Sequence, residues 1–263
     1  MQPLKIDVSA YGTNDEIKNN IHYSLSLGLT ELGLSPCKHD GTFVIVGSGP
    51  TLKHHIKDII KEQQAGRPVC AINGAADYIT ERKIIPNLFL TTDPRAMPQN
   101  LKYRNRSTVY LVASRCHPDT LNSVVEIDKG KNVMLWHAWM DKPETDELLK
   151  LNKIGIGGGT TSGLRAINVA YVMGFRKVHM YGMDSCLSDE GEKRVMDGKM
   201  SDEVKTIDVI VGGRRFICNM AMAQQADDFQ SIYDIMPDMK ITSFGDGLIS
   251  AIIEQRKSQG MPT

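Results

Sequence analysis

The chain has 263 residues, 41% hydrophobic and 24% charged, which is typical of a folded soluble protein with a sizeable core. Its 31 basic and 31 acidic residues give a formal net charge of zero, so no whole-molecule field draws it onto nucleic acid or an anionic membrane. Five widely spaced cysteines without a C-x-x-C pair signal neither a disulfide framework nor a zinc site, and reduced cytoplasmic thiols are the simplest interpretation.

Short apolar runs alternate with helical patterns along most of the chain. Residues 1–40 are polar and mixed, with one helix expected at 14–29. A strand at 42–46 leads through the turn Gly47-Ser48-Gly49-Pro50 into a helix. Further strands are expected at 68–72, 87–92, 108–112, 132–136, 177–181 and 241–244, and longer helices at 141–151, 161–173 and 221–236. This alternation predicts an α/β, Rossmann-like fold, a mostly parallel open sheet with helices on both faces.

One segment breaks the alternation. Residues 188–208 are rich in charge and poor in apolar side chains, which predicts a mobile lid inserted into the domain. A hairpin is expected at 209–216, turning at Gly212-Gly213. The expected organisation is an N-terminal helical extension (1–40), a nucleotide-binding α/β domain (41–256) and a tail (257–263). Residues 1–10 do not resemble a signal peptide and no window resembles a membrane span, so we expect a cytoplasmic protein.

Two glycine-rich segments are suited to a phosphate ligand. The first is the turn Gly47–Pro50, and the second, residues 157–163, immediately precedes an apolar helix. Glycine lets the backbone approach a ligand, and free amides at a helix start face an anion. The alternative is glycine used for packing beside an ordinary helix cap, since neither the complete dinucleotide fingerprint nor a Walker loop is present. Two such turns at one edge of a parallel sheet predict a ligand spanning both.

Polar side chains follow several of the expected strands. Asn73, Asp93 and Asp184 each end a strand, and His117 comes shortly after another. Asn73 is a candidate for reading a base or ribose. Asp93 and Asp184 are candidates for binding Mg²⁺ or acting as a base, and capping a turn is the alternative for each. His117 is a further candidate base.

Several segments resemble known nucleotide-dependent transferases. Residues 44–52 (VIVGSGPTL) and 160–184, with a T-S-G turn, a helix ending in Gly-Phe and a strand ending in G-x-D, resemble the bacterial CMP-sialic-acid-dependent sialyltransferases. With residues 71–73 and 86–94 they also resemble the 6-hydroxymethylpterin diphosphokinases and the motility-accessory flagellin glycosyltransferases. The resemblance covers roughly residues 42–187, with a looser match at 212–247.

In the sialyltransferases the matching turns hold the cytidine nucleotide. The resemblance therefore implies a donor site, to which the glycine-rich pattern adds two residues; together they are Gly47, Ser48, Gly49, Pro50, Asn73, Gly159, Thr160, Thr161, Ser162 and Gly163. Two departures stand out, since Ser48 replaces an Asn of that family and no histidine follows His179, whereas the sialyltransferases carry their catalytic histidine in the lid. Asp93, in Thr-Asp-Pro, agrees with the diphosphokinases, for which ATP and Mg²⁺ are expected.

Three hypotheses follow. The favoured one is a glycosyltransferase that uses a CMP- or UDP-type nucleotide-sugar donor and a hydroxyl acceptor, needs no cofactor or metal, and has Asp93, Asp184 or His117 as its base. The second is a Mg²⁺-dependent diphosphokinase of a small hydroxymethyl compound, with Asp93 and Asp184 as metal ligands. The third is a non-catalytic nucleotide-binding module, which the missing lid histidine keeps open. The acceptor is a glycan, a protein, a metabolite or a modified DNA base; no feature points to nucleic acid, and a homo-oligomer is compatible with the sequence.

Overall fold

The structure, a computed structural model, describes residues 12–96, 101–140, 142–197, 200–201 and 203–261. The segment screened for a signal peptide (1–10), three positions of the expected lid (198, 199 and 202) and the last two residues of the expected tail lie outside the described residues.

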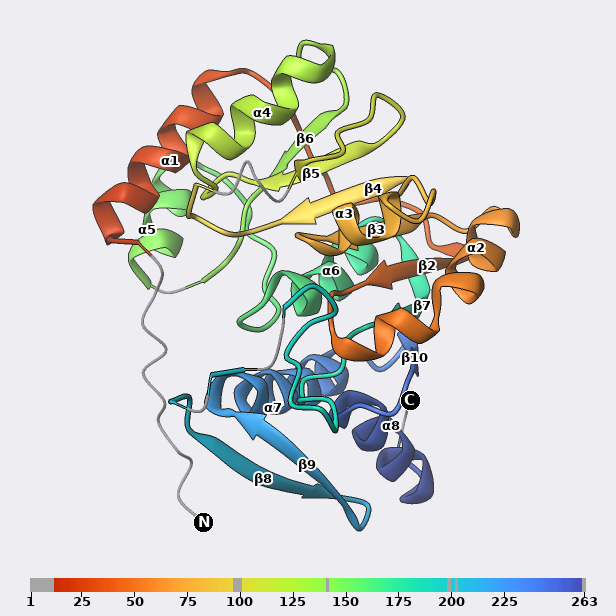
Figure 1. Cartoon of the computed structure of the whole chain (residues 1–263). Helices are drawn as coiled ribbons and strands as arrows, with labels where there is room; N and C mark the ends of the chain where they lie inside the picture. Colours follow the sequence, from red (N-terminus) through yellow and green to blue (C-terminus); the bar gives the residue numbers. More distant parts are fainter. Residues whose placement is uncertain (1–11, 97–100, 141, 198–199, 202, 262–263) are drawn as a thin grey trace.

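A single eight-stranded parallel sheet forms the centre of the molecule (Figure 1). Its strand order is β1-β6-β5-β4-β3-β2-β7-β10, and every neighbouring pair is parallel. The predicted α/β, Rossmann-like class is thereby confirmed. The strands are β1 (Thr30–Glu31), β2 (His39–Val46), β3 (Val69–Ile72), β4 (Leu88–Thr91), β5 (Val109–Ala113), β6 (Val133–Trp136), β7 (Phe175–Tyr181) and β10 (Lys240–Phe244).

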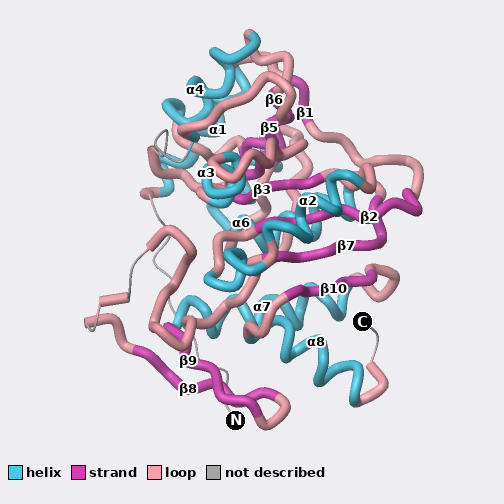
Figure 2. Tube along the Cα trace, turned by 45° about the vertical axis from the view of Figure 1, so that its right-hand side comes forward, coloured by secondary structure: helices cyan, strands magenta, loops and turns pink. Residues whose placement is uncertain are grey.

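Helices flank this sheet (Figures 1 and 2). The chain moves outward from β2 to β6 and then crosses back to β7, so right-handed crossovers place α2 and α3 on one face and α6 on the other. The helices are α1 (Asn14–Ser26), the 3₁₀ helix η1 (Pro50–His54), α2 (Ile56–Gln64), α3 (Ala75–Thr80), α4 (Pro118–Asp128), α5 (Lys142–Lys150), α6 (Ser162–Val172), α7 (Met220–Ile235) and α8 (Leu248–Ser258).

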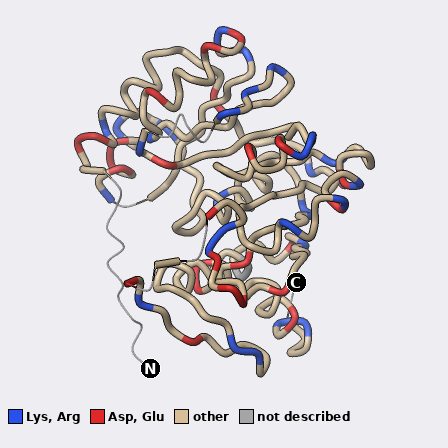
Figure 3. Tube along the Cα trace, viewed as in Figure 1, with Lys and Arg blue, Asp and Glu red and all other residues tan. Residues whose placement is uncertain are grey.

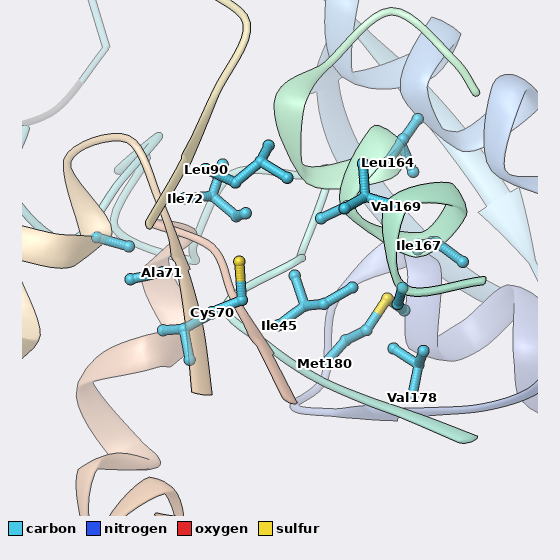
Figure 4. Close-up of a cluster of buried hydrophobic side chains, with 14 of the residues drawn as sticks. Ile45, Cys70, Ala71, Ile72, Leu90, Leu164, Ile167, Val169, Val178 and Met180 are labelled. Atoms are coloured by element: carbon cyan, nitrogen blue, oxygen red, sulfur yellow. The ribbon is translucent and has the colours of Figure 1, made fainter. Parts of the chain in front are cut away.

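The core lies between the central strands and α6. Figure 4 shows Ile45, Ile72 and Leu90 of the sheet facing Leu164 and Ile167 of the helix, and all of these side chains are buried. Strand β3 is buried along its whole length, as a central parallel strand covered on both faces must be. This packing fixes the start of α6 against the carboxyl ends of the strands.

Both segments outside the regular alternation are built into the structure. Strands β8 (Thr206–Val211) and β9 (Arg214–Asn219) form the predicted hairpin, and Gly212 and Gly213 have φ of 57° and 77°, the left-handed values that glycine tolerates best. Helix α1 packs against α4 and α5, and β1 adds a strand beside β6, so the described part of residues 1–40 extends the sheet. Helix α8 continues to Ser258, two residues into the expected tail.

Candidate functional site

The turn after β2 is packed directly against the turn after β7. The amide of Gly47 donates to the Tyr181 carbonyl at 2.8 Å, and the amide of Gly49 donates to the Gly182 carbonyl at 2.8 Å. A Cβ atom at Gly47 would lie 2.5 Å from the Gly182 oxygen, so only glycine allows this approach. The amides of Gly47 and Gly49 are therefore engaged by β7 and its turn.

Asp184 holds the same two turns together. Its Oδ2 accepts a hydrogen bond from the Thr51 amide at 2.9 Å, and its Oδ1 accepts one from the Thr51 hydroxyl at 2.5 Å. The residue is 4% exposed, and this burial raises the pKa of its carboxyl although the Thr51 hydrogen bonds oppose the change. Asp184 thus caps η1, the alternative for a strand-end aspartate, and it does not offer a carboxylate to the crevice as the expected base or metal ligand.

Ser162 ties the start of α6 to the ends of β3 and β4. Its Oγ accepts hydrogen bonds from the Thr92 amide at 3.2 Å and from Nδ2 of Asn73 at 3.4 Å. The same Oγ lies 2.7 Å from the Thr92 hydroxyl. Asn73 has a left-handed φ of 47° directly after β3. The second glycine-rich segment therefore lies at the same carboxyl edge of the sheet as the first, as the sequence predicts.

The amino terminus of α6 carries backbone amides at this edge that are unpaired among the described residues. Thr161 is its N-cap, and the Thr161 hydroxyl accepts the Leu164 amide at 3.4 Å. Within the described ranges the amides of Ser162 and Gly163 have no hydrogen-bond acceptor, although both residues are buried. Unpaired amides and the positive end of an 11-residue helix favour a bound phosphate or carboxylate.

Thr160, one residue earlier, is already engaged. Its amide and its hydroxyl donate to Oδ2 of Asp228 in α7 at 2.8 and 2.7 Å, and Gln224 donates to the other oxygen of Asp228 at 2.9 Å. Gly158 and Gly159 have left-handed φ values of 120° and 71° and pack onto α6. Residues 158–160 are therefore packed against α6 and α7, and the unpaired amides lie beyond Thr160.

Asp93 is neutralised by an arginine. Its Oδ1 accepts from the amide and Nε of Arg95 at 3.0 and 2.9 Å, and its Oδ2 accepts from Nη2 at 2.6 Å. The Asp93 side chain is 13% exposed and directly follows Thr92, which bonds to Ser162. Of the three expected base candidates, Asp93 is the one next to the amino terminus of α6.

His117 lies elsewhere on this edge. It is the N-cap of α4, where its Nδ1 accepts a hydrogen bond from the Asp119 amide at 3.1 Å. In the described part of the chain no hydrogen bond joins it to Ser162 or Asn73. The structure thus does not bring His117 into the Ser162 network.

A preformed Mg²⁺ site does not fit these carboxylates. Both oxygens of Asp184 accept from Thr51, and both oxygens of Asp93 accept from Arg95. Across the described ranges no group of three or more His, Cys, Asp or Glu side chains is placed to hold a metal.

Part of the expected lid lies over the turn after β2. The Val195 amide donates to the Ser48 carbonyl at 3.0 Å, and the Met196 methyl group packs on Gly74 so closely that a Cβ there would lie 2.5 Å away. Lys53 of η1 pairs with Glu192 at 3.0 Å. Residues 188–197 therefore cover the ends of β2 and β3 (teal, between β7 and β8, in Figure 1).

The sequence reasoning missed four residues of this edge. Thr92 precedes Asp93, and Arg95 follows it by two residues. Their position at the end of a predicted strand is the signal that could have identified them. Thr51 and Asp228 gave no signal, because they meet their partners across 133 and 68 residues of chain.

An open parallel sheet whose strand order reverses between β2 and β7, with amides at the start of α6 on its carboxyl edge that are unpaired in the described part of the chain, defines a Rossmann-like α/β protein. The chain belongs to the MptE-like family, since the family described as "6-hydroxymethylpterin diphosphokinase MptE-like" matches residues 16–190. The resemblance to the diphosphokinase group is thereby confirmed.

A solved structure shares the fold. A motility-associated glycosyltransferase, "MAf glycosyltransferase from Magnetospirillum magneticum AMB-1", aligns with a TM-score of 0.69 and 16% identity over 90% of this chain, which spans 38% of that protein. A mammalian sialyltransferase aligns with a TM-score of 0.46 and 13% identity, over 93% of this chain and 90% of that one. No curated protein sequence matches the chain. No helix within the described ranges is long and apolar enough to span a membrane.

Proposed function

We propose that the chain is a transferase that moves a sugar from a nucleotide-sugar donor to an acceptor hydroxyl. The observation that carries the proposal is the amino terminus of α6, whose Ser162 and Gly163 amides are unpaired within the described residues at the edge where such folds bind nucleotides. In this proposal the donor phosphate binds these amides, Asn73 contacts the nucleoside, and residues 188–197 cover the bound donor.

The main requirement of this reaction is to stabilise the negative charge that develops on the leaving phosphate. The acceptor oxygen forms a bond to the anomeric carbon while the bond from that carbon to the phosphate oxygen breaks. The electron pair leaves with the phosphate, and the acceptor proton passes to a base. Helix amides aimed at the phosphate stabilise the charge that develops there. Asp93 is the candidate base by position, because it directly follows Thr92 beside the Ser162 network, and its ion pair with Arg95 must open before a carboxylate oxygen can take the proton.

A Mg²⁺-dependent diphosphokinase is the second candidate. The family description matched by residues 16–190 favours it. The engaged oxygens of Asp93 and Asp184 favour the sugar transferase instead, because a diphosphokinase needs metal to neutralise the transferring phosphates.

Turnover with and without a chelator separates the two candidates. The purified chain is incubated with CMP- and UDP-sugars, or with ATP and Mg²⁺, together with an acceptor panel of glycans, peptides and hydroxymethylpterin, and products are detected by mass spectrometry. We expect sugar transfer that survives the chelator. We also expect Asp93→Asn to lower the rate more than the donor affinity, while the surface substitution Asp58→Asn changes neither. Diphosphate transfer from ATP that the chelator abolishes would establish the second candidate in its place.

A further inference from the structure

A cavity lies on the α2 face of the sheet, between α2 and the strands β7 and β10. Its volume is about 500 Å³, which is within the range of small-molecule pockets. In β7, Val178 and Met180 are buried in the core, and the alternate residues His179 and Tyr181 face α2 and line the cavity. The donor site proposed above lies at the start of α6, which covers the other face, so this cavity is a separate place on the molecule.

Glu62 of α2 is the buried centre of the cavity wall. The residue is 5% exposed, and its Oε1 accepts a hydrogen bond from the Tyr181 hydroxyl at 2.7 Å and lies 2.7 Å from Nδ1 of His179. Arg67 pairs with its Oε2 through Nη1. Burial acts to raise the Glu62 pKa, but these three contacts outweigh it and lower that pKa. The carboxylate is therefore ionised and can only accept, so Nδ1 of His179 carries the proton that it donates.

This arrangement leaves one acceptor and one set of donors for a ligand. Since Nδ1 donates to Glu62, the neutral ring of His179 presents Nε2 as an acceptor, and within the described ranges Nε2 has no partner. The His179 side chain is 22% exposed and lines the cavity. Arg67 uses Nη1 for Glu62, and in the described part of the chain its Nε and Nη2 donors have no partner. Both side chains contact the same carboxylate, so the acceptor and the donors lie close together.

Aromatic rings form the floor of the cavity. Phe244 of β10 stacks on Tyr181 with ring centroids 4.6 Å apart and an interplanar angle of 5°. His179 meets Phe244 edge-on at 5.2 Å. Phe244 is only partly buried and lines the cavity, so it offers ring surface to a ligand. Such a floor favours a planar ring over an aliphatic chain.

The charged side chains that line the cavity are paired with one another. Basic and acidic positions alternate along α2 (Figure 3). Lys61 pairs with Asp58 at 3.0 Å, and Arg67 pairs with Glu62. Because these two pairs cancel in charge, the lining favours a neutral ligand over an ion.

We propose that this cavity binds a small neutral lactam heterocycle, such as a pyrimidine or purine base. Its ring packs against Phe244, its N–H donates to Nε2 of His179, and its neighbouring carbonyl accepts from the guanidinium of Arg67. A lactam edge places one donor directly beside one acceptor, which is the complement of the two side chains. The inference goes beyond the proposed function and does not depend on it.

Calorimetry with matched ligands and variants tests this site. Uracil, hypoxanthine and a fully N-methylated uracil, which lacks the donor, are titrated into the wild type, His179→Asn and the control His22→Asn. His179→Asn keeps a donor to Glu62, because the asparagine Nδ2 replaces Nδ1, but it removes the Nε2 acceptor. His22 pairs with Glu147 at 2.8 Å outside the cavity. We expect uracil or hypoxanthine to bind the wild type and His22→Asn equally, and both the methylated ligand and His179→Asn to weaken binding by about tenfold or more.

NMR of isotope-labelled histidines supplies a measurement that needs no variant. The Nε2 resonance of His179 should shift when the base binds, and that of His22 should not. No binding of either base, equal binding of the methylated ligand, or a bound base that leaves His179 Nε2 unchanged would overturn the inference. Equal affinity of the wild type and a folded His179→Asn would overturn it as well. Ser162→Ala should bind the base as tightly as the wild type, and loss of binding there would instead place the base at the carboxyl edge.

Discussion

Replacing Asp184 should destabilise the fold, because this carboxylate locks two turns together. Asp184→Ala removes the hydrogen bonds at 2.9 and 2.5 Å and leaves the Thr51 amide without an acceptor next to a new cavity. Hydrogen bonds to a charged group contribute about 1.5–3 kcal/mol each, and the lower value applies since Thr51 is only half-buried. With the cavity included, we expect a loss of about 4 kcal/mol. Thr51→Val removes only the hydroxyl bond and should cost about 1.5 kcal/mol.

Urea unfolding at pH 7, followed by circular dichroism, measures these losses. The double variant closes a thermodynamic cycle, and we expect a coupling energy of about 1.5 kcal/mol between the two positions because they share a hydrogen bond. Asp184→Asn should cost less than Asp184→Ala, since its amide oxygen still accepts from the Thr51 amide and its NH₂ group can donate to the hydroxyl oxygen. An Asp184→Ala protein within 0.5 kcal/mol of the wild type, or strictly additive variants, would refute the structural role and return Asp184 to the list of candidate bases.

Three further predictions concern the same edge. Gly47→Ala should cost about 2 kcal/mol or more in urea unfolding, because its Cβ would lie 2.5 Å from a backbone oxygen, whereas Gly157→Ala, with nothing within 4 Å of its Cβ, should be nearly neutral; equal losses would show that the turn-to-turn contact is unimportant. Since burial raises the pKa of Asp184 above its ordinary 3.8, the folded chain holds that proton more tightly than the unfolded chain does. The proton-linked part of its stability contribution is therefore full below about pH 3.8 and is lost as the pH rises through the folded pKa, whereas the Thr51 hydrogen bonds remain at pH 7; unfolding at several pH values should find this dependence in the wild type and not in Asp184→Asn. Ser162→Ala should cost about 1–3 kcal/mol and weaken nucleotide binding in calorimetry, because it leaves the Thr92 amide without its acceptor; unchanged affinity would place the nucleotide elsewhere.

The strands could be predicted because the sheet is parallel and covered on both faces. Such strands are continuous apolar runs, and residues 69–72 and 88–91 are buried throughout. Strand β1 could not be predicted, because its two residues, Thr30 and Glu31, are exposed and carry no apolar pattern. It forms only because β6 offers a parallel edge beside it.

The sequence predicted the location of the candidate site more accurately than it predicted the roles of its residues. Sequence order put Asp93, Asp184 and both glycine-rich segments at one edge, and the structure confirms that position. It could not show that Thr51 would cap the carboxylate of Asp184 across 133 residues, or that the glycines of the first turn serve to approach the turn after β7. Those roles depend on which elements the fold brings together, and local patterns carry no information about long-range partners.

The most direct test of the central claim is a thermal unfolding scan with candidate donors. CMP-, UDP- and GDP-sugars, ATP with Mg²⁺, and buffer alone are compared for the wild type and Ser162→Ala. A ligand at 100 times its Kd stabilises the native state by about 2.7 kcal/mol, which raises the Tm of a chain of this size by roughly 5–10 °C. We expect one nucleotide-sugar to raise the wild-type Tm by that amount and to raise the Tm of Ser162→Ala clearly less. If no nucleotide shifts the wild-type Tm, the carboxyl edge at α6 is not a nucleotide site; equal shifts in both proteins would show that the Ser162 hydroxyl does not help to position the amides that bind it.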